Sequence, residues 1–566
     1  MKREFPRAVW RVAEMDRRAA ADLAQAAGVP PVVAQLLLQR GVSTPEEARL
    51  FLNPSLSQLF DPFLMTDMQK AVDRITLARE RGERVVVFGD YDVDGVSATA
   101  LLTRALARFG IASVLPRMPD RLRDGYGILP AHVDQAHADG AGLIVTVDNG
   151  TSALAAAERA RALGMGLVVT DHHSIEGPLP PAEAVVNPRR EPEGHPGGAL
   201  CGAGVAFKLG CALNGTPNDL DIAALGTVAD IMPLRGENRN LVALGLRHMK
   251  RYERLGIARL AQVAGFSLKE VTSERISFHL GPRINAVGRL DDARAALDLL
   301  LAECPKEAGR LADVLNAANT ERRQIEQRIF DEAMEEIESL GLEKGDAIVV
   351  ARSGWHQGVV GIVASRLVSR YHRTVAVLCV EGDIARGSAR AAPGVDLMEA
   401  LNACRAHFSK YGGHRAAAGM TLGRPAIDAF AADFVRAVGV QTGGDPARPL
   451  LHVDAQAAFS MVDEALLRAL EAMEPFGNAN PAPVFAAYGV EVVAGSVRVL
   501  KDRHLKMSLR QGDKVFASLW FQQAERYLTG DFPSLADAAF TPVFDERAMD
   551  GSIQLYLKDL RPAEGG

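Results

Sequence analysis

Aspartates and histidines that follow short apolar runs are the residues of this sequence most able to do chemistry. The clusters are Asp90, Asp92 and Asp94 after residues 85–88, Asp148 after 143–147, Asp171, His172 and His173 after 167–170, and Asp230 after 227–229. Carboxylate and imidazole ligands with little sulfur suit Mn²⁺ or Mg²⁺ better than a structural zinc. Two such ions about 3.5–4 Å apart stabilise the attacking and the leaving oxygen of a phosphoryl displacement. The clusters therefore predict a two-metal site for phosphate chemistry.

The first cluster has two interpretations when it is taken alone. Asp90, Asp92 and Asp94 alternate along the chain, so they point to one side if the preceding strand continues through them, and a cation among them would relieve their repulsion. An acidic turn is equally consistent with the pattern, because Asp-Gly is a common turn dipeptide. A calcium loop is disfavoured, because its twelfth position needs Glu and Leu101 stands there.

The histidine pair favours the metal interpretation. A single His after a strand is more often structural than a ligand. Here Asp171, His172 and His173 follow one predicted strand, and Asp148 follows the strand before it. In such an arrangement one carboxylate can bridge two cations while a His takes a terminal position on one of them.

The sequence pattern predicts that a parallel sheet with helical crossovers positions these residues. Short Val-rich runs are typical of buried parallel strands, and from about residue 68 to 250 they alternate with helical patterns. The Pro- and Gly-rich stretch at 177–198 is expected to be a loop or extended excursion outside the core. In an open α/β sheet the ligand site lies outside the carboxyl ends of the strands. We therefore expect all four clusters at one edge of the sheet.

The segments on either side of this region differ in character. Residues 1 to about 60 look helical, and the cap Thr44 followed by Pro45 marks a helix start. Between Pro305 and Gly341, apolar residues recur every three to four positions, which predicts an amphipathic helix. Such a helix would span on the order of 50 Å, which suits a connection between two domains.

The last two hundred residues predict two further modules. A second α/β unit is expected at about 345–438, followed by a linker at 441–446. Beyond residue 450, several short alternating segments indicate a small β-barrel.

Composition limits the class of protein. At 566 residues the chain is expected to form three to four domains, and its 48% hydrophobic content is that of a globular protein. The absence of a long apolar run and the charged N-terminus predict no membrane span, no secretory signal and a cytoplasmic location. The five cysteines form no CxxC pair, which argues against disulfides and thiolate zinc. A net charge of −6 is unlike that of a non-specific nucleic-acid binder. It does not exclude nucleic-acid binding, because only a local basic path is needed to bind phosphate.

The four clusters resemble the motifs of the DHH phosphoesterase superfamily. The matching residues are 89–95, 147–150, 171–173 and 228–230, and the glycine-rich stretch 412–419 is similar to the signature of the domain associated with that family. Within the superfamily, the chain is similar to the bacterial exonucleases specific for single-stranded DNA. That likeness covers about residues 50–560 and includes the stretches 281–289, 354–361 and 474–481.

The resemblance implies a fold and a division of the chain. The fold would be α/β, with a parallel-sheet DHH catalytic domain, a long helix leading to a smaller α/β DHH-associated domain, and then an OB-like β-barrel. The implied segments are 1–60 (helical), 61–300 (catalytic), 301–341 (connecting helix), 342–440 (phosphate-binding) and 450–562 (nucleic-acid-binding).

The resemblance also implies cofactors and catalytic residues. Two Mn²⁺ or Mg²⁺ ions would be held by Asp92, Asp94, Asp148, His172 and Asp230. Many superfamily members carry a His where this chain has Phe88, so Asp90 is the candidate replacement ligand. His173 would orient or polarise the scissile phosphate or protonate the leaving group. Asp171 would fix a His ring or cap a helix.

Further residues are implied to bind DNA. A phosphate clamp for the 5′ end would use Ser388, Arg390, Gly412, Gly413, His414 and Arg415, although glycine pairs alone usually just make turns. Arg283 and Arg289 would bind backbone phosphate, or the Arg283–Asn285 segment would buttress the site. On the barrel, the single-stranded DNA would contact Lys501, Arg503, Lys506 and Trp520. Alternatively, the basic residues form a solvated turn and Trp520 is a core aromatic, which periodicity favours.

The activity implied is metal-dependent 5′→3′ degradation of single-stranded DNA to 5′-mononucleotides in repair and recombination. The alternatives are a phosphodiesterase for cyclic dinucleotides or very short RNA, a pyrophosphatase, and a scaffold without metals. The long helix and the barrel favour a polymer substrate, and the full ligand set disfavours the scaffold. Implied partners are single-stranded DNA with a 5′ end, a single-strand-binding protein and a helicase, with the protein itself a monomer.

Overall fold

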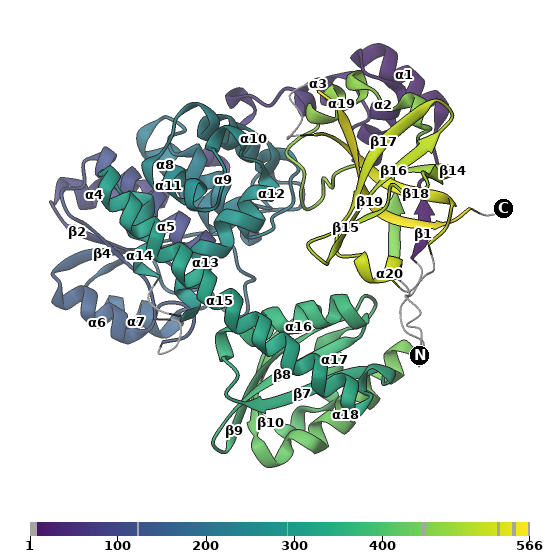
Figure 1. The fold of residues 1–566 in the computed structure, drawn as a ribbon. Helices are drawn as coiled ribbons and strands as arrows, with labels where there is room; N and C mark the ends of the chain where they lie inside the picture. Colours follow the sequence, from purple (N-terminus) through teal and green to yellow (C-terminus); the bar gives the residue numbers. More distant parts are fainter. Residues whose placement is uncertain are drawn as a thin grey trace. The chain divides into compact units, whose positions relative to one another are not determined.

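The computed structural model describes residues 8–120, 124–290, 293–443, 449–528, 532–545 and 551–563. The chain divides into two compact units, one formed by Val12–Ala318 with Val453–Gly566 and the other by Met1–Arg11 with Asn319–His452 (Figure 1). The domain boundaries expected from the sequence stay a prediction, and part of the expected linker, residues 444–448, lies outside the described residues.

A five-stranded parallel sheet organises the first unit. Its order is β3-β2-β4-β5-β6. The strands are β2 (Arg84–Phe88), β3 (Val114–Arg117), β4 (Ala141–Val147), β5 (Gly166–Thr170) and β6 (Ala184–Val186). Val85 and Val87 pack into one core, while Val86 and Phe88 pack into another, so both faces of the sheet are covered. The predicted parallel sheet is confirmed.

Helices supply the crossovers and cover both faces of this sheet. They are α4 (Met68–Glu80), α5 (Val93–Phe109), α6 (Pro130–Ala138), α7 (Leu154–Ala162), α8 (Gly202–Asn214), α9 (Leu220–Ala229), α10 (Gly236–Arg251), α11 (Leu255–Val263), α12 (Ser273–Arg275), α13 (Gly281–Leu290) and α14 (Arg294–Leu301). Residues of α4, α5 and α8 belong to the core on one face, and residues of α6 and α7 to the core on the other.

Three expectations about these elements are wrong. The strand before Asp90 ends at Phe88, and Asp92 caps α5, so the three aspartates do not alternate along a strand. Residues 227–229 end helix α9 rather than a strand, because a short apolar run does not distinguish a strand from a buried helix segment. The stretch 177–198 is not all outside the core, since β6 lies within it and is buried.

The second unit contains a mixed sheet. Its order is β10-β11-β9-β8-β7, in which only β7 and β8 are parallel to each other. The elements are β7 (Ala347–Ser353), α16 (Gln357–Tyr371), β8 (Thr374–Glu381), β9 (Ile384–Arg390), α17 (Leu397–Ala403), β10 (Phe408–His414), β11 (Ala417–Gly423) and α18 (Ile427–Thr442). The predicted long helix is present as α15 (Pro305–Leu340), whose first half packs in the core of the first unit and whose second half packs beside α16.

A closed barrel completes the first unit. It consists of β14 (Phe485–Val492), β18 (Leu535–Phe544), β19 (Ile553–Pro562), β17 (Lys514–Trp520) and β16 (His504–Gln511), closed by pairing of β14 with β16. The flanking elements are β13 (Ala455–Gln456), α19 (Glu464–Glu471), β15 (Arg498–Leu500) and α20 (Ala524–Leu528). The predicted barrel is confirmed.

The N-terminal helices belong to the same core as the barrel. They are α1 (Arg17–Ala27), α2 (Pro31–Gln39) and α3 (Pro45–Leu52), and α3 has the predicted Thr44 cap. Leu36 and Leu37 of α2 are fully buried with Phe459 and Phe485 of the barrel region. A separate two-stranded ribbon pairs β1 (Val9–Val12) with β12 (Leu450–Val453). Residues 1–60 therefore do not form a core of their own within the part of the chain described.

Two smaller expectations can be compared with the structure. Among the described helices, no single one is long and apolar enough to cross a membrane, and α1 with α2 would pass that test only as a pair bent by 109°. The five cysteines are free. Cys201, Cys379 and Cys404 are buried, whereas Cys304 is exposed.

Candidate metal centre

The centre is built at the carboxyl ends of β4 and β5. Asp148 follows β4 directly and has a left-handed backbone with φ 62°, a conformation that Asp tolerates better than most residues. Asp171 follows β5 directly, and His172 and His173 come next in the chain. Because the two strands are parallel neighbours, their ends deliver these side chains to one edge of the sheet.

His172 lies at the middle of a group of carboxylates. Its Nε2 is 3.1 Å from Asp148 Oδ1, 3.6 Å from Asp94 Oδ2 and 3.8 Å from Asp230 Oδ2. Burial lowers the pKa of His172, which favours the neutral ring that a metal ligand requires. The structure thus brings together residues that lie far apart in the sequence.

Helix starts hold two of the aspartates. Asp92 accepts hydrogen bonds from the amides of Asp94 and Gly95, so it caps α5. The two oxygens of Asp94 accept from the amides of Gly202 and Ala203, at 2.7 and 2.9 Å, at the start of α8. The positive end of α8 therefore stabilises the Asp94 carboxylate and fixes its direction.

Glycines allow this close packing. A Cβ atom on Gly202 would lie 2.5 Å from Cβ of Asp148, and one on Gly226 would lie 2.7 Å from Oδ1 of Asp94. Both distances are shorter than the contacts that real Cβ atoms make, so a side chain at either position would displace a candidate ligand. Sequence reasoning missed these two glycines and the start of α8, because nothing local in the sequence shows that they face the aspartates.

Asp171 and Tyr126 hold the ring of His173. Asp171 Oδ1 is 2.8 Å from His173 Nδ1 and also accepts from the amide of His172, while its Oδ2 accepts from the amide of Thr151. Tyr126 places its hydroxyl 2.9 Å from the same ring nitrogen and donates to the carbonyl of Asp148. Asp171 therefore fixes a His ring, as expected, and no helix starts there. Tyr126 was not foreseen, since it lies in a glycine-flanked loop with no motif.

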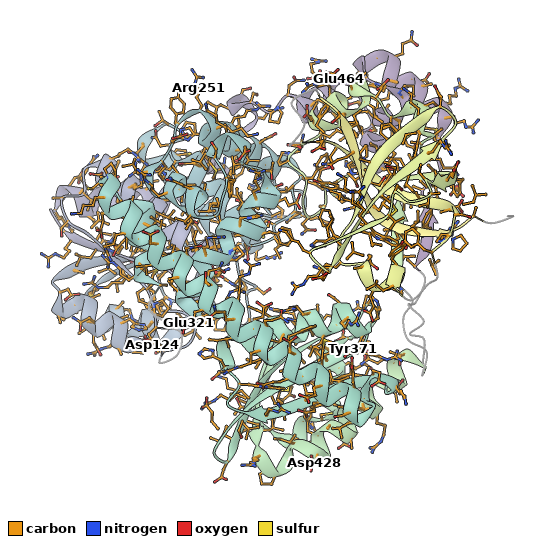
Figure 2. The ribbon with its side chains drawn as sticks, in the orientation of Figure 1. Asp124, Arg251, Glu321, Tyr371, Asp428 and Glu464 are labelled. Carbon is orange, nitrogen blue, oxygen red and sulfur yellow. The ribbon has the colours of Figure 1, made fainter. Side chains whose placement is uncertain are left out.

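Phe88 points away from the cluster. It packs in the core on the opposite face of the sheet, with its ring centroid 4.8 Å from that of His132. Nε2 of His132 in turn lies 3.3 Å from Oδ2 of Asp124, which is labelled in Figure 2. Asp90 is 4% exposed and belongs to the cluster, close to Asp92 and Asp148. The geometry is compatible with Asp90 as the replacement ligand, and that role stays a prediction.

The carboxylates raise one another's pKa. Burial, followed by the charges of Asp94 and Asp92, raises the pKa of Asp148 well above its usual value and that of Asp230 to about 8. Burial and the charge of Asp94 also raise the pKa of Asp92. Their crowding therefore holds protons on the cluster unless a cation replaces them.

Asp171 and His173, beside the cluster, have pKa shifts that favour their charged forms. Burial would raise the pKa of Asp171, but the hydrogen bond and charge of His173 outweigh it and lower the pKa to about 2. Burial would lower the pKa of His173, but the hydrogen bond and charge of Asp171 outweigh it and raise the pKa. This pair therefore favours an ionised carboxylate and a protonated imidazole.

The donor set fits two divalent cations. The ligand atoms form three groups, each within 4.8 Å: Asp90, Asp92 and Asp148; Asp94, His172 and Asp230; and Asp148, His172 and His173. The first two groups are joined by the contact between Asp148 and His172. Asp148 Oδ1 is buried, and although His172 Nε2 is 3.1 Å away, the two atoms are not aligned for a hydrogen bond, which is costly for the carboxylate unless a cation binds it. Hard oxygen ligands with one or two imidazoles suit Mn²⁺ or Mg²⁺.

Three family models match the chain. They are the DHH family N-terminal domain at residues 84–229, the DHHA1 domain at 345–439 and the RecJ OB domain at 453–559. The single-stranded-DNA-specific exonuclease RecJ of Bacillus subtilis is 37% identical over 91% of this chain and 66% of its own length. The exonuclease of the same name from Dickeya dadantii is 36% identical over 88% of this chain and 89% of its own length.

The chain belongs to the RecJ family.

Solved structures agree with that assignment. The structure of RecJ with Mn²⁺ from Thermus thermophilus has a TM-score of 0.83 to this chain, at 29% identity, and covers 98% of this chain and 80% of the other. The structure of the same protein with Mg²⁺ has a TM-score of 0.76, at 28% identity, and covers 98% and 78%.

Helix α13 carries the predicted residues Arg283 and Arg289. Arg283 donates to Oδ1 of Asn316 at 3.1 Å and to the carbonyl of His279 at 2.7 Å. Asn285 accepts from the amide of Val93, and a Cβ on Gly288 would lie 2.8 Å from the carbonyl of Tyr91. The helix therefore packs against the segment that holds Asp92, which supports the buttress interpretation. Phosphate binding by the two arginines stays a prediction.

The glycine-rich motif of the second unit is a β-hairpin rather than a loop. Gly412, Gly413 and His414 lie in edge strand β10, and Arg415 lies in the turn that leads to β11. Arg415 is exposed, with Asp396 3.9 Å away. Glycine pairs look alike in turns and strands, so sequence reasoning could not separate the two.

Register places the predicted phosphate-binding side chains on one sheet face. Arg390 pairs with Ala417, which pairs with His414, and Ser388 pairs with Gly419, which pairs with Gly412. Directly paired residues share a face, so these two neighbouring rows carry a guanidinium, an imidazole and a hydroxyl around a strip of bare glycine backbone. Arg390 Nη1 donates to Ser388 Oγ at 2.8 Å. Lys410 and Arg386 extend the same face by one row.

The barrel has an aromatic and basic outer surface, but Trp520 is not part of it. Trp520 is 4% exposed and lies in the core, so the predicted contact of this ring with DNA is wrong and the core interpretation holds. The next residue, Phe521, is 47% exposed, with its centroid 5.2 Å from Tyr556 and 5.5 Å from His504. Trp520 is the last residue of strand β17, and Phe521 lies in the turn that follows it.

Basic residues border this aromatic surface. Lys506 pairs with Arg498 across the β15–β16 hairpin and with Leu519 on the other side, which pairs with Tyr556. Lys501 and Arg503 are exposed in the turn of the hairpin. Lys506 therefore shares a sheet face with Tyr556, and Lys501 and Arg503 belong to the same hairpin as Lys506. Sequence reasoning did not assign Phe521 and Tyr556 to DNA contact.

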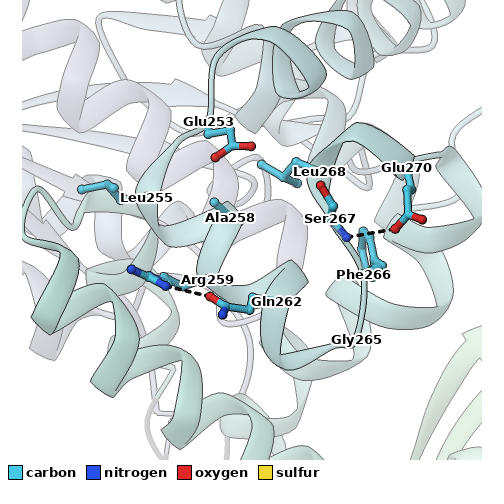
Figure 3. Close-up of a pocket in the computed structure, with 10 residues that line it drawn as sticks. All are labelled: Glu253, Leu255, Ala258, Arg259, Gln262, Gly265, Phe266, Ser267, Leu268 and Glu270. Carbon is cyan, nitrogen blue, oxygen red and sulfur yellow. Dashed lines mark hydrogen bonds between the residues drawn. The ribbon is translucent and has the colours of Figure 1, made fainter.

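A pocket of about 680 Å³ opens beside helix α11 and the loop that follows it (Figure 3). Arg259 donates to Gln262 and the amide of Ser267 donates to Glu270 along its wall. None of the predicted metal or DNA residues lines it. The pocket is therefore separate from the cluster described above.

Proposed function

We propose that this protein is a metal-dependent exonuclease that degrades single-stranded DNA in the 5′→3′ direction to 5′-mononucleotides, in DNA repair and recombination. The observation that carries this proposal is the pair of three-ligand groups joined by Asp148 and His172. Family membership supports the substrate, because the relatives are named as exonucleases specific for single-stranded DNA.

Two divalent cations, Mn²⁺ or Mg²⁺, are the proposed cofactors, and RecJ of Thermus thermophilus has been solved with each. When bound, they would stabilise the attacking and the leaving oxygen of the phosphodiester. The residues proposed to hold them are Asp90, Asp92, Asp94, Asp148, His172 and Asp230. Capping of α5 by Asp92 and the grip of the α8 amides on Asp94 keep two of these ligands in place before substrate arrives.

His173 is the residue proposed to act on the substrate itself. With Nδ1 donating to Asp171, the other ring nitrogen can donate to the scissile phosphate or to the leaving oxygen. The hydrogen bond and charge of Asp171 raise the pKa of His173 against the effect of burial, which favours the protonated ring for that role. Tyr126 limits rotation of the ring by its contact with Nδ1.

The face of Arg390, Ser388, Gly412 and His414 is proposed to bind the terminal 5′ phosphate. Bare glycine backbone lets an anion approach the strand closely, and the guanidinium and imidazole supply charge-assisted hydrogen bonds. Fixing a 5′ end would account for stepwise cleavage. Gly413 and Arg415 flank the same hairpin.

The barrel surface is proposed to bind the single-stranded DNA. Exposed aromatic rings stack on bases of any sequence, and lysines and arginines pair with the backbone phosphates. Phe521 and Tyr556 provide the rings, while Lys501, Arg503 and Lys506 provide the charge. A single-strand-binding protein and a helicase as partners, a monomeric state and a cytoplasmic location are further parts of the proposal.

Digestion of end-labelled oligonucleotides with Mn²⁺ tests the activity. A single-stranded DNA of about 30 nucleotides carries one label at the 5′ end and another at the 3′ end. We expect the 5′ label to be released first, as a mononucleotide, and no release after chelation of the metal. Release of the 3′ label first, or of internal fragments, would contradict the polarity.

A cyclic dinucleotide and a blunt duplex serve as matched substrates in the same assay. The single strand should be cut at least about 100-fold faster than either, because the barrel surface and the phosphate face both act on an extended strand. Faster cleavage of the cyclic dinucleotide would instead favour the small-nucleotide phosphodiesterase.

A further inference from the structure

The turn after Asp230 has an unusual backbone. Helix α9 ends with hydrogen bonds from the amide of Ile231 to the carbonyl of Val228 and from the amide of Met232 to the carbonyl of Thr227, each 3.2 Å long. This pattern is a Schellman motif, in which the residue after the cap is left-handed and is most often glycine. Here that residue is Ile231, with φ 56°. A β-branched residue is a poor choice for this conformation, so something else must hold the turn.

A segment almost 250 residues further along the chain supplies that hold. Asn478 donates from Nδ2 to the carbonyl of Ile231 at 2.7 Å, and its own carbonyl accepts from the amide of Leu234 at 2.8 Å. Arg235 adds a longer bond, from Nε to the carbonyl of Ala479 at 3.3 Å. Asn478 therefore bonds to both ends of the turn, including the carbonyl of the strained residue itself.

The segment around Asn478 is built to be rigid. Asn480 is 1% exposed, donates to the carbonyls of Met473 and Pro475, and accepts from Nε of Arg40 at 2.6 Å. Gly477 pairs with Asn480 in an isolated bridge. Such a segment can impose a conformation on a neighbour instead of following it.

The fit between the segment and the turn is close. A Cβ atom on Gly477 would lie 2.8 Å from Cδ1 of Leu234, so any side chain there would make Leu234 move. The hydroxyl of Ser273 binds the carbonyl of Phe476 in a further contact. Both sides of this contact belong to the same compact unit.

We propose that Asn478 is a positioning residue for the metal centre. By binding the carbonyl of Ile231 and the amide of Leu234, it keeps the left-handed turn closed and so keeps the Asp230 carboxylate, one residue earlier, within 3.8 Å of His172. The barrel region then contributes to metal binding as well as to strand binding. This inference rests on the proposed function only in taking Asp230 as a metal ligand.

The test compares Mn²⁺ binding by full-length Asn478→Asp and wild-type protein without DNA, by isothermal titration calorimetry. Aspartate has the same shape but cannot donate to the Ile231 carbonyl. We expect Mn²⁺ to bind about 10-fold more weakly, as is usual when a residue that orients a ligand is lost. Cleavage should show a lower kcat with unchanged KM for DNA, and extra Mn²⁺ should restore it.

Asn218→Asp is the matched control, because Asn218 is an exposed loop asparagine of the same unit and the substitution adds the same charge. It should bind Mn²⁺ like the wild type. Asn478→Ala, which removes the donor without adding charge, should weaken Mn²⁺ binding to a similar degree, and it replaces Asn478→Asp if that variant does not fold. Wild-type Mn²⁺ affinity in both Asn478 variants would overturn the proposal.

A rescue distinguishes positioning from general packing. Glycine adopts the left-handed conformation without strain, so Ile231→Gly in the Asn478→Asp background should recover most of the Mn²⁺ affinity. Failure of the rescue in a folded double variant would overturn the role assigned to the turn. Since the titration needs no DNA, a wild type that releases no 5′ label would refute the proposed function and leave this test intact.

Discussion

Two buried groups of aspartates in the same unit lie in opposite electrostatic environments. Asp219 and Asp221, at the start of α9, are surrounded by arginines: Arg254 binds both, with distances of 2.7–2.9 Å, and Arg104 and Arg108 bind Asp219. Asp148 and Asp230, beyond the other end of α9, lie among further carboxylates and histidines. Helix α9 thus has, at its start, aspartates that arginines neutralise. Beyond its other end lie aspartates whose pKa values depend mainly on burial and on neighbouring carboxylates.

The pKa values record this difference. Burial would raise the pKa of Asp219, but the charges of Arg254, Arg104 and Arg108 outweigh it and lower the pKa. Burial and neighbouring carboxylates together raise the pKa of Asp230 to about 8. A buried carboxylate that is paired within the chain stabilises the fold, whereas one left among like charges is suited to an external cation. The contrast separates structural acids from candidate ligands without reference to a motif.

The largest expected effect is on catalysis. Asp148→Ala should lower Mn²⁺-dependent release of the 5′ label by at least about 1,000-fold, because it removes the carboxylate shared by two ligand groups. Single-stranded DNA binding, measured by fluorescence anisotropy with Ca²⁺ in place of Mn²⁺, should stay detectable. Activity within about 10-fold of the wild type would refute the bridging role and weaken the contrast.

The next effect is on stability. Asp219→Asn should lower the free energy of unfolding by about 1.5–3 kcal/mol, because Arg104 and Arg108 lose their carboxylate partner and Arg254 keeps only Asp221. Urea denaturation measures this change. The remaining folded protein should still bind Mn²⁺ with wild-type affinity. A stable Asp219→Asn protein would show that the arginines do not need this carboxylate.

The two groups should also respond to pH in opposite directions. A lowered folded-state pKa means that Asp219 contributes stability above about pH 4 that is lost as the pH falls further. A raised pKa, about 8 for Asp230, means that its contribution is present below about pH 4 and is lost as the pH rises to 8. In EDTA, Tm should therefore fall between pH 6 and pH 8, and less so in Asp230→Asn. Equal declines in both proteins would contradict the assignment.

The smallest effect tests redundancy in the arginine group. Arg104→Met should lower the free energy of unfolding by about 1 kcal/mol, because Arg108 and Arg254 still neutralise Asp219 and Arg104 is partly exposed. Urea denaturation beside Asp219→Asn gives the comparison. A loss as large as that of Asp219→Asn would show that the three arginines act as one unit.

The part of the centre that could be predicted from sequence is the part that depends on local rules. Asp148 and Asp171 follow buried Val-rich runs directly, and parallel strands bring their carboxyl ends to one edge. Asp230 was placed at the same edge for a wrong reason, since it ends a helix. Its run of apolar residues is buried all round, so neither a two-residue nor a 3.6-residue period shows in it.

The parts that could not be predicted depend on contacts between distant segments. The α8 amides reach Asp94 over 108 positions, and Asn478 reaches Ile231 over 247. The resemblance includes residues 474–481, but nothing in the sequence shows that Asn478 faces Ile231 or that the α8 amides face Asp94. On the barrel, periodicity favours a core position for Trp520, but Phe521 lies beyond the end of β17, so strand alternation does not predict its exposed ring.

The shared core of the N-terminal helices and the barrel has a consequence for synthesis on the ribosome. Helices α1–α3 leave the ribosome well before Phe459, Phe485 and Phe540, which share their core. At about 5–20 residues per second, the roughly 400 intervening residues take about 20–80 s to translate. During that time the apolar faces of α2 are without their final neighbours. The parallel-sheet domain can be complete by then, so helices α1–α3 are made before that domain but finish folding after it.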